Sequence, residues 1–249
     1  MKLFANFFPI MKIIGTLKPI KQNFRDMQAA RDLGDNELER ERILETTSYW
    51  GADIMNRLGS DIHVYGEENI PDEGPVVLMG NHQGYADIFT YCAVFTKFQF
   101  GFVAKRELAE LPFFGDKIKA IRSVFINRDT ARSSMEAIND GIKLIEQGFS
   151  LAIFPEGTRS KGGEPKPFMK GSVKLATKPG VPIVPVSIEG TYKMLEQDGY
   201  FHGDDIYIKI HPPIPTAGIS RKEEKELIPN IEKTVMDGVE ELKKLSQSC

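Results

Sequence analysis

VVLMGNHQGYADIFTYCAVF (residues 76–95) contains an apolar run and the first polar side chains that follow it. Residues 76–79 are apolar throughout, which is typical of a strand whose two faces are both covered in a parallel sheet. Gly80 ends this run, and His82 and Asp87 follow before apolar side chains resume. The stretch therefore predicts an α/β fold with two ionisable side chains where a strand ends, which is where ligands bind in open α/β sheets.

Strand-like segments alternate with helical patterns from residue 61 onward. Besides residues 75–79, the segments predicted as strands are 62–66, 100–104, 123–127, 150–154, 182–188 and 205–211. Helical patterns such as residues 131–147 lie between them, and the last helix begins at a capping box formed by Ser220 and Glu223. Several strands are apolar throughout, so we predict a mostly parallel central sheet flanked by helices over residues 61–249.

The first 60 residues show helical periodicity in three segments. The second segment, for example, places Phe24, Met27, Ala30 and Leu33 on one face. We predict a helical hairpin over residues 1–60 that precedes the main α/β domain. The first segment does not predict a transmembrane span, because Asn6 and Lys12 interrupt an apolar run that would need about 20 residues.

Charge is distributed unevenly along the 249 residues, whose formal net charge is −3. Residues 1–25 contain five lysine and arginine residues and no acidic residue. Five large apolar side chains lie in the same arm: Phe4, Phe7, Phe8, Ile10 and Met11. We predict that this basic, amphipathic arm docks on an anionic membrane surface, the alternative being that its apolar side chains pack in the core. We expect no nucleic-acid partner.

His82 and Asp87 are of the residue types that form a general base and its orienting partner. Histidine exchanges a proton near neutral pH, and a carboxylate bonded to its other ring nitrogen fixes the tautomer. No G-x-S-x-G elbow is present, so we expect the proton to come from a substrate hydroxyl that attacks an activated acyl group. Two alternatives stay open. One is a structural histidine at a turn. The other is a metal site formed by His82, Asp87 and Glu156, which no characteristic spacing of metal ligands in the sequence supports.

The segment FPEGTRSKGG (154–163) follows another predicted strand. Gly157 allows the backbone to approach a ligand, while Thr158 and Arg159 add a hydroxyl donor and a fixed cation. Because a guanidinium binds phosphate bidentately, this combination suits a phosphate group. Two further cations stand at predicted strand ends: Lys105 and Arg128. The alternative is an ordinary polar loop whose solvated charges contribute little.

NHQGYAD (81–87) and FPEGTRS (154–160), in this order and about seventy residues apart, resemble two sequence blocks of the glycerophospholipid acyltransferase family. Between them, AKRELAELPFFGDKIKAIRSVFINR (104–128) is similar to the family's second block. VPIVPVSI (181–188) is similar to the fourth block, which contains proline. The resemblance covers roughly residues 62–215, and within the family it points to the bacterial 1-acyl-glycerol-3-phosphate acyltransferases.

Two positions depart from the second block of that family. Arg122 stands where the family often has a glycine, and Asn127 stands where it often has an aspartate. These departures bear on how closely the acceptor pocket copies the pocket of the family, whereas the reaction itself is not affected.

The resemblance implies a role for each candidate residue. His82 would be the general base, and Asp87 would be the carboxylate that orients it. The acceptor's phosphate would be bound by Arg159 together with Lys105 and Arg128, at a site shaped by Glu156, Gly157 and Thr158. The resemblance implies no metal ion and no prosthetic cofactor.

The implied reaction transfers a fatty acyl chain from a thioester to the free sn-2 hydroxyl of 1-acyl-glycerol 3-phosphate (lysophosphatidic acid), which gives phosphatidic acid. Either acyl carrier protein or coenzyme A would carry the thioester. We expect the enzyme at the cytoplasmic face of the cell membrane, as a peripheral or monotopic protein. Three alternatives stay open: acylation of glycerol 3-phosphate or of another lysophospholipid, hydrolysis, and non-catalytic lipid binding.

Overall fold

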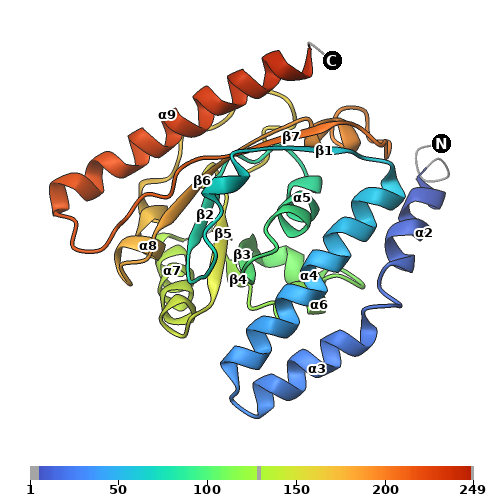
Figure 1. Cartoon of the computed structure of the whole chain (residues 1–249), viewed down its shortest axis with the longest axis horizontal. Coiled ribbons are helices and arrows are strands. Elements are labelled where there is room, and N and C mark those ends of the chain that lie inside the picture. The colour runs from blue at the N-terminus through green and yellow to red at the C-terminus, as the bar shows by residue number, and fades with distance from the viewer. Residues whose placement is uncertain (1–5, 128–129, 248–249) are drawn as a thin grey trace.

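A mostly parallel sheet forms the centre of the molecule (Figure 1). In the computed structural model, which describes residues 6–127 and 130–247, the strands of this seven-stranded sheet follow the order β1-β7-β6-β2-β5-β3-β4. Their bounds are β1 (Ile62–Tyr65), β2 (Val77–Gly80), β3 (Phe100–Lys105), β4 (Val124–Ile126), β5 (Ser150–Ile153), β6 (Ile183–Glu189) and β7 (Ile206–Ile210). Only β6 and β7 pair antiparallel among these strands, so the predicted sheet is confirmed.

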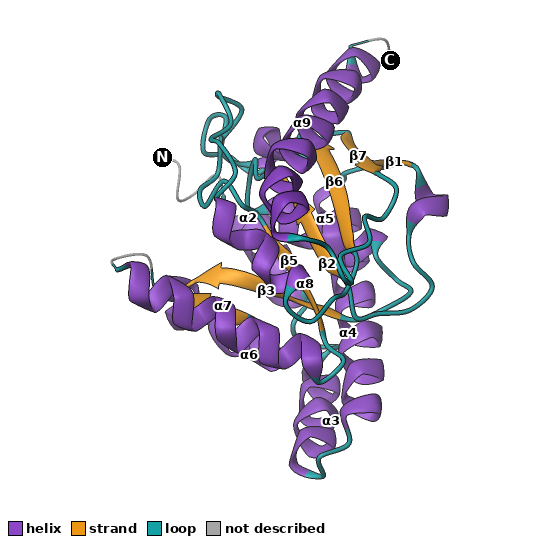
Figure 2. Ribbon diagram, turned by 90° about the vertical axis from the view of Figure 1, so that its left-hand side faces the viewer, coloured by secondary structure: helices purple, strands orange, loops and turns teal. Residues whose placement is uncertain are grey.

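Helices cover both faces of the sheet (Figure 2). One layer contains α2 (Phe7–Gly15), α3 (Lys21–Asp32), α4 (Asn36–Leu58), α5 (Ala86–Val94) and α6 (Gly115–Ala120). The other layer contains α7 (Ala131–Glu146), α8 (Lys174–Thr177) and α9 (Arg221–Ser246). Short 3₁₀ turns, η1 (Glu67–Asn69), η2 (Arg106–Glu110), η3 (Lys170–Val173) and η4 (Thr191–Met194), connect these elements.

Strand β2 carries the buried stretch that precedes the candidate site. Leu78 points into the layer of α2–α6, whereas Val77 and Met79 point into the layer of α7–α9, and all three are fully buried. Strands β5 and β6 pair with β2 on its two sides, and Met79 is opposite Ile153 of β5. Because β2 and β5 are parallel and end side by side, the loops that follow them are neighbours.

From residue 6 onward, the described part of the N-terminal region contains a helical hairpin and one helix before it. Helices α3 and α4 form the hairpin around Gly34, and α2 precedes them as a separate helix (Figure 1). Asp35 caps α4 by accepting the main-chain N–H of Leu38 at 3.0 Å. Gly59 ends the same helix in a left-handed conformation with φ 75°, which glycine adopts without strain. The helix thus begins and ends at residue types that favour these two positions.

The N-terminal helices share an apolar core with the sheet. Ile13, Ile20 and Ile43 are buried in the same cluster as the apolar side chains of β2 and α5. Leu33, which the sequence pattern places on the buried face of α3, is 80% exposed because α3 ends at Asp32. Across residues 6–127 and 130–247, no helix has both the length and the apolar composition that crossing a membrane requires.

A buried ion cluster ties these helices to the body of the molecule. Glu39 of α4 is fully buried and accepts hydrogen bonds from Arg31 (2.6 Å) and from Arg122 (2.7 and 2.8 Å). Arg122 adopts a left-handed φ of 61°, a conformation that favours the glycine often found there in the resembled family. Through Glu39, Arg122 contacts an N-terminal helix, and it is not among the residues that line the pocket described below.

Candidate active site

The loop after β2 is anchored on both sides of His82. Asn81 exchanges two hydrogen bonds of 2.9 Å with the main chain of Ile188 in β6. Gln83 donates to the carboxylate of Glu189 at 2.7 Å and accepts a main-chain N–H just beyond β6 at 3.0 Å. These bonds hold the main chain of His82 against the end of β6, which limits the directions in which its ring can point.

Asp87 lies in the first turn of α5 and is the hydrogen-bond partner of His82. Its Oδ2 accepts from His82 Nδ1 (2.6 Å) and from the main-chain N–H groups of Gln83 (2.8 Å) and Gly84 (3.1 Å). Its Oδ1 accepts from the hydroxyl of Thr191. The carboxylate is fully buried and only accepts hydrogen bonds, so His82 carries a proton on Nδ1. In the neutral ring, Nε2 is then the basic nitrogen.

The imidazole of His82 packs on the ring of Phe154, with centroids 4.2 Å apart and an angle of 8° between the planes. The side chain is 18% exposed, and this exposed part lines the pocket. Glu156 accepts the main-chain N–H of His82 (2.7 Å) and that of Lys166 (3.0 Å). Burial raises the pKa of Glu156, although these two hydrogen bonds oppose the shift. Glu156 therefore joins two loops of the site.

The residues of the alternative metal site are bonded in other ways. Within residues 6–127 and 130–247, no group of three or more histidine, cysteine, aspartate or glutamate side chains is placed to hold a metal ion. Each oxygen of Glu156 accepts a main-chain N–H, and Oδ1 of Asp87 accepts the hydroxyl of Thr191. His82 is thus oriented by a single carboxylate, an arrangement suited to general-base catalysis.

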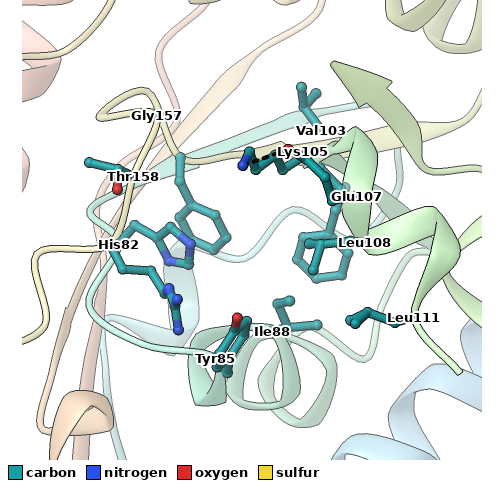
Figure 3. Close-up of a pocket in the computed structure, with 14 residues that line it drawn as sticks. His82, Tyr85, Ile88, Val103, Lys105, Glu107, Leu108, Leu111, Gly157 and Thr158 are labelled. Atoms are coloured by element: carbon teal, nitrogen blue, oxygen red, sulfur yellow. Dashed lines mark ion pairs between the residues drawn. The ribbon is translucent and has the colours of Figure 1, made fainter. Parts of the chain in front are cut away.

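A pocket of about 430 Å³ opens beside His82 (Figure 3). Its polar lining includes His82, Lys105, Gly157, Thr158 and Arg159, and its apolar lining includes Ile88, Phe102, Val103, Leu108 and Leu111. In Figure 3, His82 and Thr158 lie at one end of the pocket, whereas Leu108 and Leu111 lie at the other. The pocket therefore suits a ligand that has a polar head and an apolar chain.

Arg159 is held at the polar end of the pocket by two contacts. Its Nη1 donates to Oε1 of Glu196 at 2.6 Å, and its Cζ lies 3.6 Å from the ring centroid of Tyr85. Gly157 adopts a left-handed φ of 73°, which lets the loop turn tightly before Arg159. Gly157, Thr158 and Arg159 all line the pocket, so the structure brings these three predicted residues together with His82.

Of the two other predicted cations, Lys105 and Arg128, the structure describes Lys105. Lys105 lies at the end of β3, lines the pocket, and forms an ion pair of 2.7 Å with Glu107. More than half of each side chain is exposed, so this pair contributes little stability and an anionic ligand can compete for the lysine. Arg128 lies outside the described residues.

Two further residues of the site, Thr191 and Glu196, are not indicated by the sequence motifs. Thr191 begins η4, which Gly190 separates from the end of β6, and Glu196 follows in the next turn. A polar residue just beyond a buried strand is a signal that could have indicated Thr191. Glu196 carries no such signal, because it meets Arg159 across 37 positions of the chain.

Comparisons with known proteins agree on one family. The family model described as Acyltransferase matches residues 61–189. A 1-acyl-sn-glycerol-3-phosphate acyltransferase of Borreliella burgdorferi is 35% identical over 190 residues, which cover 74% of each chain. The protein of that name from Bacillus subtilis is 28% identical over 195 residues, covering 78% of this chain and 94% of the relative.

A solved structure is similar over nearly the whole chain. The crystal structure of the 1-acyl-sn-glycerophosphate (LPA) acyltransferase PlsC from Thermotoga maritima matches with a TM-score of 0.74 and 30% sequence identity. The match covers 98% of each chain, so it includes the N-terminal helices as well as the sheet. The likeness extends beyond residues 61–189, the part that the family model matches.

Proposed function

Since this chain belongs to the acyltransferase family, we propose that it is a 1-acylglycerol-3-phosphate O-acyltransferase. Its acceptor is lysophosphatidic acid and its product is phosphatidic acid. The observation that carries the proposal is the His82–Asp87 pair, whose histidine lines one pocket together with Arg159 and an apolar wall. A protein that only bound lipid would not need a base oriented by a buried carboxylate.

The chemistry follows from the position of His82 in that pocket. The sn-2 hydroxyl transfers its proton to Nε2 as its oxygen attacks the thioester carbonyl, while Asp87 stabilises the imidazolium that forms. The C–S bond then breaks, and the leaving sulfur takes the proton back from the imidazolium. An ester and a free thiol result, His82 returns to its neutral form, and no acyl-enzyme is formed.

The other residues of the pocket divide between the two ends of the acceptor. Arg159 and Lys105 bind the phosphate, together with Arg128, while Glu156, Gly157 and Thr158 shape that end. The apolar side chains Ile88, Phe102, Leu108 and Leu111 provide a surface for an acyl chain.

A single assay with purified protein tests the proposal. Lysophosphatidic acid is offered with acyl-coenzyme A or with acyl-acyl carrier protein, and phosphatidic acid formation is followed. We expect product with at least one donor, and the comparison identifies which donor is used. Glycerol 3-phosphate and another lysophospholipid serve as competing acceptors. Faster acylation of either one would replace the proposed acceptor, and release of free fatty acid alone would indicate a hydrolase.

Arg159→Ala is expected to weaken use of the acceptor by tenfold or more. Loss of a charge-assisted hydrogen bond typically costs about 1.5–3 kcal/mol, which corresponds to that factor or a larger one. Arg159→Lys should restore only part of the loss, because an ammonium cannot reproduce the planar fork of a guanidinium. The measurement is the KM for lysophosphatidic acid at saturating donor. An unchanged KM in Arg159→Ala would show that this residue does not bind the phosphate.

We further propose that α2 docks on an anionic membrane at the cytoplasmic face. Phe7, Phe8 and Met11 are 55%, 74% and 48% exposed, so they do not pack in the core. Each large apolar side chain that enters the interface contributes about 1.5–3 kcal/mol. Lysine and arginine near an anionic leaflet add about 1 kcal/mol each. Phe4, which belongs to the same predicted surface, lies outside the described residues.

The docking proposal predicts that serine at Phe7, Phe8 and Met11 together releases the protein from vesicles containing anionic phospholipid, with binding at least about tenfold weaker. Truncation of the arm is a poorer test, because Ile13 and Ile20 are buried in the core. The measurement is sedimentation with vesicles. Leu33→Ser is the matched control, because Leu33 is 80% exposed and lies at the end of α3. If the triple variant pelleted as fully as the unmodified chain, α2 would not be the docking surface.

A further inference from the structure

The guanidinium of Arg159 is fixed from two directions. Glu196 accepts a hydrogen bond from Nη1 at 2.6 Å, and the ring of Tyr85 lies 3.6 Å from Cζ. Nη1 forms this hydrogen bond, and among the described residues Nε and Nη2 of Arg159 have no hydrogen-bond partner. The edge formed by Nε and Nη2 therefore keeps two parallel donors, the arrangement that binds a phosphate bidentately.

Glu196 is itself held firmly. Its side chain is only 4% exposed, and its Oε1 also accepts the main-chain N–H of Tyr85 at 2.9 Å. Its Oε2 is buried and has no hydrogen-bond partner among the described residues. Gly84 leaves space for that oxygen, because a Cβ at this position would lie 2.6 Å from it. A buried carboxylate with one unbonded oxygen is unfavourable for folding, so a role at the pocket accounts for it better than stability does.

The chain segment that carries Glu196 also reaches the proposed base. Thr191, at the start of the same segment, donates its hydroxyl to Asp87. Glu196 follows in the turn after η4, and it bonds both Arg159 and the main chain of Tyr85. One segment beyond β6 thus contacts the orienting carboxylate and the cation of the phosphate site. Rotation of Arg159 away from the pocket would break its bond to this segment.

We propose that Glu196 is a positioning residue that holds Arg159 with its Nε–Nη2 edge free for the phosphate of the acceptor. The proposal rests on the proposed function, since it assigns the acceptor's phosphate to this guanidinium. A carboxylate on one edge of a guanidinium reduces the number of rotamers that the arginine can adopt. Less side-chain entropy is then lost when the phosphate binds.

Two competing explanations predict different results. If Glu196 only supported the loop at Tyr85, its effects would be independent of Arg159 and would add to those of an Arg159 substitution. If its negative charge only repelled the phosphate, its removal would tighten binding. The positioning role predicts weaker binding that depends on the presence of Arg159.

The test is a double-mutant cycle with Glu196→Ala, Arg159→Ala and the double variant. The first readout is the dissociation constant for a short-chain lysophosphatidic acid, measured by calorimetry. The second is KM and kcat for the same compound with the donor found active. Glu196→Gln keeps an acceptor oxygen of the same shape. Asp198→Ala is the matched control, because it removes an exposed carboxylate of the same segment that pairs with His202.

We expect Glu196→Ala to raise the dissociation constant and KM about tenfold, with a smaller change in kcat. The double variant should bind no more weakly than Arg159→Ala alone. Glu196→Gln should recover most of the loss, and Asp198→Ala should behave as the unmodified chain. Circular dichroism and the melting temperature establish that each variant is folded.

Unchanged or tighter binding in Glu196→Ala would overturn the positioning role. Additive losses in the double variant would overturn it as well, in favour of loop support. The binding measurement does not depend on turnover. If the unmodified chain binds lysophosphatidic acid without acylating it, the proposed reaction is refuted, and the double-mutant cycle still tests the role of Glu196. Absence of any binding by the unmodified chain would refute both proposals.

Discussion

His82→Ala is expected to lower acyl transfer by at least about 100-fold while the fold is retained. Nε2 of His82 is the proposed proton acceptor, and His82 is the only imidazole among the described residues that line the pocket. Because the imidazole lines the pocket, its removal enlarges that pocket and leaves no closed cavity in the core. A water molecule or Lys105 cannot replace a base whose direction is set by a buried carboxylate.

The measurement is kcat with saturating lysophosphatidic acid and donor, beside circular dichroism of the same sample. His63→Ala is the matched control: it also removes an imidazole, but this ring stacks on Tyr207 and lies outside the pocket. The control should keep its full rate. More than a tenth of the original turnover in His82→Ala would mean that another group removes the proton.

Asp87→Asn is expected to lower acyl transfer by about 10²–10⁴-fold, because a neutral amide cannot stabilise the imidazolium and no longer fixes the proton on Nδ1. With the other tautomer, Nε2 of His82 would carry the proton and could not act as a base. Asparagine matches aspartate in shape, so the fold should be kept. Asp205→Asn is the control for the loss of a carboxylate, since Asp205 is 53% exposed and pairs with His63.

Asp87→Ala should affect stability as well as activity. The buried carboxylate accepts from His82, Thr191 and two main-chain N–H groups, and alanine would leave these donors without a partner. An unsatisfied buried group costs about 1–3 kcal/mol, so urea unfolding should show a clear loss of stability. The two variants separate the roles of Asp87: full activity in Asp87→Asn would show that the carboxylate is structural only.

The sheet is predictable from the sequence because its signals are local. Each strand is a short apolar run, and strands such as residues 76–79 are apolar on both faces because helices cover both faces of the sheet. The His82–Asp87 pair is local too, since five positions around a helix start bring the two side chains together. The motifs at 81–87 and 154–160 lie close together because β2 and β5 are parallel neighbours, as a mostly parallel sheet permits.

The remainder of the site depends on contacts that no local pattern encodes. Glu196 meets Arg159 across 37 positions and Thr191 meets Asp87 across 104, and both contacts require β6 to lie beside β2. The burial of Glu39 by Arg122 likewise needs α4 to pack against a loop 83 positions away. The residue types and short spacings of the sequence therefore determine the strands and the His82–Asp87 pair. The order of the strands and the packing of distant segments decide which further side chains hold Asp87 and Arg159 in place, namely Thr191 and Glu196.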